Sequence, residues 1–258
     1  MHDLSRYNNT PQQKPWQRWL AIFVLAVGLA GCAGNDEQQD FAGSVAEAYK
    51  NAGESMERGN YRRAIAIYEQ LQARFPFSDF ATQIQLELMY AYYKADSPEQ
   101  AVDIADTFMR ENPIHPRVDY ALYIKALAYF DDSAGFLERI FRKEITNRPP
   151  RDAELAFSLF SRLIERYPAS PYAADAQQRM VFLRNRLAAY ENSVARHYIK
   201  QGAYVAALNR AKTALQDYQG ADSSQDSLEL MIRAYEGLGM MELAADTRRV
   251  LQTNFPDS

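Results

Sequence analysis

Few residues of this chain are of the types that carry out catalysis or bind metal ions. It has one cysteine, Cys32, and three histidines, of which His2 lies in a stretch typical of a leader. The other two, His115 and His197, cannot form an HExxH zinc motif, and no glycine-rich phosphate loop is present. If Cys32 carries lipid, no thiol is left as a nucleophile. The sequence therefore predicts a protein that is not an enzyme and has no cofactor, metal or catalytic site.

Cys32 ends a pattern that resembles a bacterial lipoprotein leader. Lys14 and Arg18 precede the apolar residues 19–30, which are too few to span a bilayer but suit a signal-peptide core. The run ends in Leu29-Ala30-Gly31-Cys32, which resembles a lipobox, with small residues that admit a protease and a thiol for lipidation. The alternative is a short membrane anchor with an incidental buried cysteine. A secreted chain with one cysteine has no internal disulfide, so we expect residues 1–31 to be a signal peptide.

The resemblance to lipoproteins implies a diacylglyceryl group and an amide-linked acyl chain, such as palmitate, on Cys32. At about 0.8 kcal/mol per buried methylene, several acyl chains make the anchoring effectively permanent. Lipoproteins of the inner membrane commonly carry aspartate where this chain has Ala33. By analogy, the lipid would hold the protein at the periplasmic face of the outer membrane, with residues 32–43 as a tether.

A repeated helical pattern occupies most of the remaining chain. Residues 59–76, GNYRRAIAIYEQLQARFP, place their apolar residues on one stripe of a helix, between a Gly-Asn turn and a proline. A small residue stands twelve positions before that proline. The same spacing recurs from Ala64 to Pro76, Ala101 to Pro113, Ala156 to Pro168 and Ala244 to Pro256, and a copy from Ala207 to Gln219 lacks the proline. Each unit is a helix pair with small residues where its helices cross.

This unit resembles the tetratricopeptide repeat, which has small residues at the helix crossing and a final proline. It predicts an all-α fold, a superhelical solenoid of about five tetratricopeptide-like helix pairs in a domain of residues 44–258. We expect N-terminal repeats over 44–130, C-terminal repeats over 150–258 and one long helix over 172–200. The insertion between them, 131–148, has an apolar stripe that either packs on its neighbours or binds a partner.

Stacked helix pairs present a concave groove that binds extended peptides or other domains. The net charge of -4 leaves no basic excess to neutralise phosphates, which argues against a nucleic-acid partner. The sequence thus predicts a lipid-anchored protein that binds other polypeptides, and this architecture alone does not identify the partner.

Several longer segments resemble one family. They are FPFSDF, QIQLELMYAYYK, RENPIHP, RMVFLRNRLAAYE and GAYVAALNR, and with the repeats around them they cover nearly all of residues 45–250 in order. These segments are similar to the BamD family, lipoproteins of the outer-membrane β-barrel assembly (BAM) complex. The insertion is longer than expected of the family, and Phe75 stands where tyrosine is common. The resemblance implies five tetratricopeptide repeats and a function in folding and inserting outer-membrane β-barrels.

The resemblance also implies a substrate site in the N-terminal repeats. There the family contacts the C-terminal, aromatic-ended strand of an unfolded barrel, which places Arg62, Phe75, Phe77 and Arg110 in substrate contact. Aromatic side chains offer stacking area, and arginines pair with a carboxylate or with backbone carbonyls. Phe75 also lies on the predicted core stripe, so a structural role is the alternative for that residue.

A second implied site lies in the C-terminal repeats, where the family binds the last periplasmic domain of BamA through an arginine that matches Arg210. Asn209 lies beside it, and Arg210 faces away from Ala207, so we expect it to be exposed. Arg210→Glu is then expected to weaken BamA binding without unfolding the repeats. BamE and BamC are further implied partners.

A function of another class stays open: a pilotin-like tetratricopeptide lipoprotein that brings a secretin to the outer membrane. Depletion of such a protein would remove one oligomer and leave the porins at their normal level. An envelope enzyme would need a catalytic cluster, which the sequence lacks.

Overall fold

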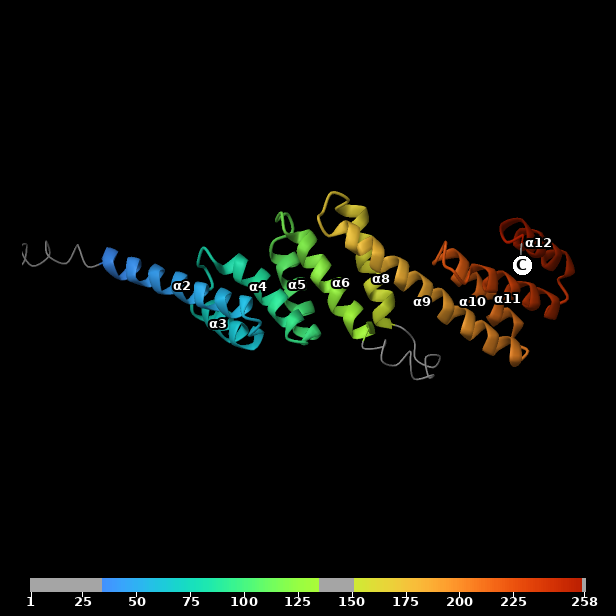
Figure 1. Ribbon diagram of the computed structural model, residues 1–258, viewed down its shortest axis with the longest axis horizontal. Coiled ribbons are helices and arrows are strands. Elements are labelled where there is room, and N and C mark those ends of the chain that lie inside the picture. Colours follow the sequence, from blue (N-terminus) through green and yellow to red (C-terminus); the bar gives the residue numbers. More distant parts are fainter. Residues whose placement is uncertain (1–33, 135–150, 257–258) are drawn as a thin grey trace, which may run out of the picture. The chain divides into compact units, whose positions relative to one another are not determined.

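The computed structural model describes residues 34–134 and 151–256, with side chains from Ser44 to Phe130 and from Arg151 to Pro256. Helices make up nearly all of these residues, and no strand occurs among them (Figure 1). Cys32, the predicted signal peptide and residues 135–148 of the predicted insertion lie outside the described residues. The helices are α2 (Gly34–Glu57), α3 (Tyr61–Arg74), α4 (Ala81–Lys94), α5 (Pro98–Glu111), α6 (Val118–Ala134), α8 (Arg151–Arg166), α9 (Ala173–Lys200), α10 (Tyr204–Gln216), α11 (Ser224–Gly237) and α12 (Met241–Asn254).

The prediction of an all-α repeat fold is confirmed. The predicted pairs correspond to α2 and α3, α4 and α5, α6 and α8, α9 and α10, and α11 and α12. The described residues from Ala52 onward belong to one compact unit, and those up to Asn51 belong to a separate one. Within the larger unit each helix packs on the next along the chain, and α4 also packs on α6 and α9 on α11. Each repeat therefore packs on the next mainly through its second helix, with added first-helix contacts at α4–α6 and α9–α11, as in helical solenoids.

Helix α2 begins earlier than the sequence pattern predicted. We expected the first helix to start at Ser44 after a tether, but the helix starts at Gly34, so residues 34–43 are helical. No proline interrupts residues 34–43, so no helix breaker of that kind separates this stretch from the rest of α2.

The crossing residues of the repeats are buried as predicted. Ala64, Ala101, Ala156 and Ala207 are fully buried, and Ala244 is nearly so. Residues four positions further on are also buried, namely Tyr68, Ala105, Phe160 and Ala211. Small side chains let the two helix backbones approach closely at the crossing. Because the loop begins a fixed number of residues after the crossing, the twelve-residue spacing is regular while the loop sequences vary.

The single long helix predicted near residues 172–200 is confirmed as α9, which has 28 residues. At 1.5 Å per residue it is about 42 Å long. Its Leu183 and Leu187 belong to the largest apolar core, together with residues of α4, α5, α6 and α8. Further along, Ala195 packs with Ala211 of α10 and Leu230 of α11. One helix thus supports both the N-terminal and the C-terminal repeats.

Candidate protein-binding surfaces

Three of the loops between repeats share one backbone geometry. They are residues 75–80, 112–117 and 167–172, each with a proline at its second position. In each loop the first N–H donates to the carbonyl four residues earlier at 2.8 Å, and the fourth N–H donates to the carbonyl of the first residue at 2.9–3.1 Å. The equal geometry reflects the equal spacing from the buried alanine to the proline.

The same three loops lie at one edge of the repeats. Gln85, just after the first loop, donates its side-chain amide to Glu111, just before the second, at 2.9 Å. Ser170 of the third loop donates its hydroxyl to Asp119, which follows the second loop, at 2.7 Å. We call residues 75–80, 112–117 and 167–172 the loop edge.

Three of the four predicted substrate residues lie in the loop edge or directly beside it. Phe77 projects from the first loop and is 98% exposed, whereas Phe75 is half-buried and its N–H donates to the carbonyl of Leu71. Arg110 is exposed in the last turn of α5. Arg62 lies in the first turn of α3, whose 14 residues span about 20 Å, so it is at the opposite end of that helix. The structure brings Phe75, Phe77 and Arg110 to one edge and leaves Arg62 apart.

A second surface, missed by the sequence analysis, is aromatic and joins α6 to the start of α9. We call its tyrosines Tyr120, Tyr123 and Tyr172 the tyrosine cluster. The rings of Tyr123 and Tyr172 stack at 4.7 Å and 18°, and the ring of Tyr120 lies 5.6 Å from that of Tyr172. The guanidinium of Arg117 lies 4.6 Å over the Tyr120 ring. The signal in the sequence was the spacing of Tyr120 and Tyr123, three apart on one face of a helix.

Polar groups fix the tyrosine cluster in place. The Tyr123 hydroxyl donates to Asp175 at 2.6 Å, and Nε of Arg179 donates to the same carboxylate at 2.6 Å. Burial, helped by Asp175, raises the pKa of Tyr123 to about 12. Burial alone would raise the pKa of Asp175, but hydrogen bonds from Arg179 and Tyr123 outweigh it and lower this pKa. Half-buried rings held in this way can accept apolar or aromatic side chains of a bound polypeptide.

Arg210 in the C-terminal repeats is exposed, as predicted, but it is also held by an internal partner. Its side chain is 44% exposed, and its guanidinium lies 3.2 Å from both carboxylate oxygens of Glu191 on α9. The Glu191 side chain is only 6% exposed. Burial raises the pKa of Glu191 more than Arg210 lowers it. Asn209 is exposed beside Arg210. The ion pair orients the arginine at the surface and ties α10 to α9.

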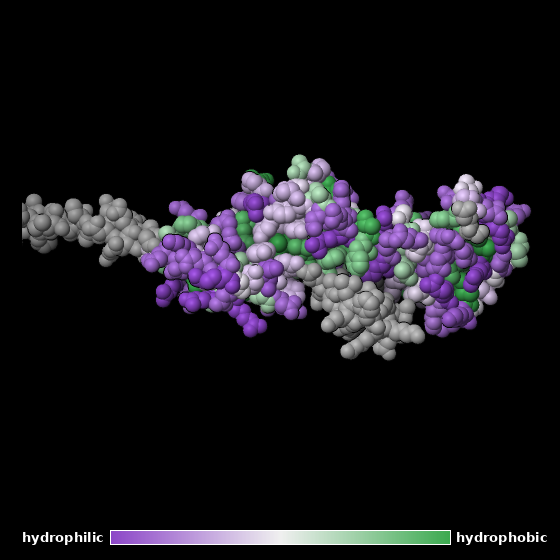
Figure 2. All heavy atoms as spheres, viewed as in Figure 1, coloured by the Kyte–Doolittle hydropathy of each residue, from purple (hydrophilic) through white to green (hydrophobic). Residues whose placement is uncertain are grey.

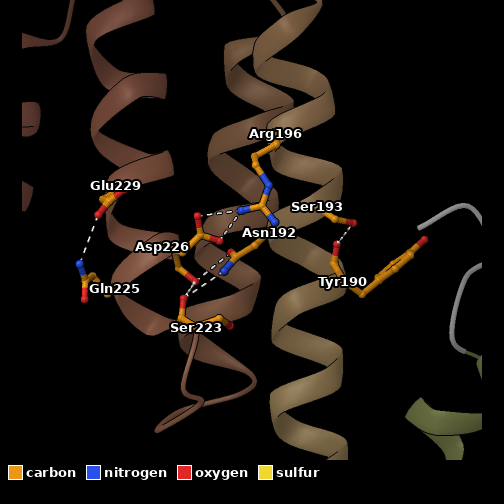
Figure 3. Close-up of polar contacts among 9 residues, drawn as sticks. Tyr190, Asn192, Ser193, Arg196, Ser223, Gln225, Asp226 and Glu229 are labelled. Atoms are coloured by element: carbon orange, nitrogen blue, oxygen red, sulfur yellow. Dashed lines mark hydrogen bonds and ion pairs between the residues drawn. The ribbon is translucent and has the colours of Figure 1, made fainter. Parts of the chain in front are cut away.

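A buried polar network next to this pair joins α9 to α11 (Figure 3). Asn192 and Ser227 are fully buried, and the Ser227 hydroxyl donates to the Asn192 side chain at 2.8 Å. The Asn192 amide donates to the carbonyl of Ser223 at 3.0 Å. At the surface, Arg196 bonds both oxygens of Asp226 at 2.6–2.7 Å. Because these groups satisfy one another, the network sets the register of α11 on α9.

The described ranges show two further features that bear on function. None of their His, Cys, Asp and Glu side chains gather in a group of three or more suited to hold a metal ion. Within the same ranges, no helix combines the length and the apolar character needed to cross a bilayer.

Stacked helix pairs that cross at buried small residues place the protein in the class of tetratricopeptide-like helical-repeat proteins. Within that class, the chain belongs to the YfiO family of outer membrane lipoproteins, whose family model matches residues 42–251. It is 42% identical to the outer membrane protein assembly factor BamD of Neisseria gonorrhoeae, over 93% of this chain and 90% of that protein. It is 35% identical to the protein of that name from Vibrio cholerae, over 90% of this chain and 96% of the other.

These relatives confirm the resemblance seen in the sequence. A solved structure of the MamA protein also aligns, over 82% of this chain and 92% of that one, but at 16% identity and a TM-score of 0.37. That likeness is too distant to carry an argument.

Proposed function

We propose that this protein is a lipid-anchored, non-catalytic subunit of the outer-membrane β-barrel assembly complex. In this function it binds unfolded barrel precursors and the periplasmic domain of BamA, for folding and insertion. The observation that carries the proposal is the 42% identity to the Neisseria gonorrhoeae assembly factor over nine-tenths of both chains. The matched stretch spans the whole repeat domain, including the segments that carry the candidate surfaces.

Lipid on Cys32 would anchor the protein to the periplasmic face of the outer membrane. The family description as outer membrane lipoproteins supports this part of the proposal. Only Ala33 separates Cys32 from the start of α2 in the sequence, so few residues lie between the lipid and the first helix. Mass spectrometry of the mature protein should find acyl chains on Cys32, and Cys32→Ala should release the protein from the membrane fraction.

The substrate site would lie at the loop edge, with Phe75, Phe77 and Arg110 in contact with the final strand of an unfolded barrel. The projecting Phe77 ring and the nearby Arg110 support this placement, because they offer an aromatic strand both a ring and a cation. Arg62 would be reached only by a longer bound segment, at the far end of α3. The tyrosine cluster extends the aromatic surface toward α9.

BamA would bind at Arg210 and Asn209 in the C-terminal repeats, with BamE and BamC as further partners. The orientation of Arg210 by Glu191 supports this contact, since a pre-ordered side chain loses less entropy on binding.

Purification of the tagged full-length protein in gentle detergent tests the function directly. A membrane-embedded barrel protein with periplasmic repeats should be recovered with it, and its absence would contradict the proposal. Depletion separates the pilotin-like alternative. Loss of many barrel proteins supports the assembly function, whereas loss of one secretin oligomer with normal porins supports the alternative.

A further inference from the structure

Two large apolar side chains of the loop edge stand almost entirely in solvent. Phe77 is 98% exposed and Ile114 is 96% exposed, and each directly follows the proline of its loop. The next most exposed large apolar side chain of the described residues is Met241, at 62%. Phe77 and Ile114 occupy the same position in loops with the same backbone hydrogen bonds. Their exposure is therefore a property of the edge and not of a single residue.

The backbone holds these tips in a fixed form. Pro76 and Pro113 fix one backbone angle next to each tip, and the loop hydrogen bonds close the turn on either side of it. In Figure 1 the turns from α5 to α6 and from α8 to α9 project along the upper margin. Figure 2 shows hydrophobic atoms at the surface there, among hydrophilic ones. Rigid tips lose little conformational entropy when they insert into another phase.

Arginines stand behind the tips at corresponding positions. Arg74, Arg110 and Arg166 each lie in the last turn of the helix that leads into a loop of the edge. None of the three forms a salt bridge within the described residues. Glu111 and Asp119, which flank the loops, accept hydrogen bonds from neighbouring side chains, and Asp79 of the first loop is an exposed carboxylate. All three arginines are exposed, and within the described residues only Arg110 among them has a side-chain hydrogen bond, to the Thr107 hydroxyl, so an outside anion can reach them.

We propose that the loop edge docks on a phospholipid surface that contains anionic lipids. Phe77 and Ile114 insert below the headgroups, and the three arginines bind lipid phosphates. An amphipathic surface of apolar side chains and flanking arginines is what an anionic membrane interface binds. Isolated tips that project outward form no groove for a protein side chain, but they enter a soft interface.

This docking rests on the proposed function only in that the lipid anchor already holds the protein at a membrane. It competes with substrate for Phe77, whereas Ile114 is not among the proposed substrate residues. Ile114 therefore reports lipid contact alone.

Vesicle flotation tests the edge without the anchor. The probe is the mature chain from residue 32 with Cys32→Ser, mixed with vesicles of phosphatidylethanolamine and phosphatidylglycerol. Binding should fall by about a hundredfold in the double variant Phe77→Ser with Ile114→Ser, because each buried large apolar side chain contributes a factor of about ten. The matched control is Val205→Ser with Met241→Ser, two exposed apolar residues away from the edge. An equal loss in both pairs, or no vesicle binding by the parent chain, would overturn the proposal.

Tryptophan fluorescence tests insertion in the acylated protein. Both tryptophans of the chain, Trp16 and Trp19, lie in the predicted signal peptide. A single tryptophan introduced into the mature protein is therefore the source of all its tryptophan fluorescence. Phe77→Trp and Ile114→Trp should each be quenched by brominated acyl chains, and Val205→Trp should not.

An unquenched Ile114→Trp would show that the tip stays in water and that the inference is wrong. If Phe77→Ser then still weakens binding of an unfolded barrel segment, the edge is a protein site. In that case the proposed assembly function stands without membrane docking.

Discussion

The ion pair between Glu191 and Arg210 offers a direct test of how α10 is held on α9. Arg210→Gln removes the cation and leaves the Glu191 carboxylate, which is almost buried, without its strongest partner. Glutamine keeps one hydrogen-bond donor near the site and much of the arginine stem. The substitution therefore isolates the charge rather than the packing.

The expected cost lies between two limits. An exposed ion pair contributes about 0–1 kcal/mol, and breaking a fully buried one costs about 3–5 kcal/mol. Glu191 is 6% exposed but Arg210 is 44% exposed, so water screens one side of the pair. We expect a loss of about 2 kcal/mol in the free energy of unfolding. For a unit the size of residues 52–258, this lowers Tm by about 4–8 °C.

The loss should depend on pH with a defined sign. Burial raises the pKa of Glu191 in the folded state above its unfolded value, so its ionised form penalises the fold. Without Arg210 this pKa rises further, because the cation that lowered it is gone. The cost of Arg210→Gln should be fully present at neutral pH and should shrink as the pH falls below the raised pKa, where Glu191 is protonated in the folded protein.

Thermal and urea unfolding followed by circular dichroism, at several pH values, measure these quantities. The control is Arg248→Gln, because Arg248 and Glu236 form a pair in which both side chains are more than two-fifths exposed. The double variant Glu191→Gln with Arg210→Gln should recover most of the stability. A loss no larger than that of Arg248→Gln, or a loss independent of pH, would refute the reasoning.

The same pair changes how the proposed BamA contact should be tested. From the sequence alone, Arg210→Glu was expected to leave the repeats folded. That substitution places a second carboxylate beside the almost buried Glu191, and the two carboxylates repel each other. A loss of BamA binding could then come from a loss of folding. Arg210→Lys keeps the charge but not the planar guanidinium, whose other N–H groups a partner can bind. We expect it to weaken binding while its Tm stays close to that of the parent protein.

One further pair of substitutions tests local packing, and another substitution tests a hydrogen bond. Gly237→Ala should lower the unfolding free energy by about 1–3 kcal/mol, because a Cβ there would lie 2.4 Å from the Tyr204 ring. Gly53→Ala is its control, since no atom lies within 4 Å of that Cβ, and it should stabilise the helix by about 0.5–1 kcal/mol in the same denaturation assay. Tyr123→Phe removes a hydrogen bond to Asp175, so NMR titration should show a higher pKa for that carboxyl, and an unchanged pKa would contradict the hydrogen bond.

The repeat architecture could be predicted because its signal is local and recurs. A helix crossing needs a small residue, and the loop that follows needs a fixed number of residues to reach the next repeat. The buried Ala64, Ala101 and Ala156 therefore identify the repeats even where the residues around them differ from one repeat to another. The start of α2 was misjudged because short polar residues suit both a tether and the exposed end of a helix.

The surfaces were less predictable because they depend on pairs of residues far apart in the chain. Tyr123 and Tyr172 are 49 positions apart, and only the packing of α6 beside α9 stacks them. The buried Glu191 did leave a local signal. It falls in the four-residue series of Leu183, Leu187 and Ala195, all buried on one face of α9. A charged residue in such a series implies a buried partner of opposite charge.

That series also explains why the C-terminal repeats sit on α9 in one register. In the first half of the helix the buried row is apolar, and leucines tolerate small shifts of a neighbouring helix. At Glu191 and Asn192 the row is polar, and each of these two groups needs its partner on α10 or α11 at hydrogen-bond distance. Any shift would leave a buried charge or amide unpaired, which costs more than an imperfect apolar contact. The orientation of Arg210 at the surface is therefore set by the core beneath it, and a partner that binds this arginine meets a side chain already in place.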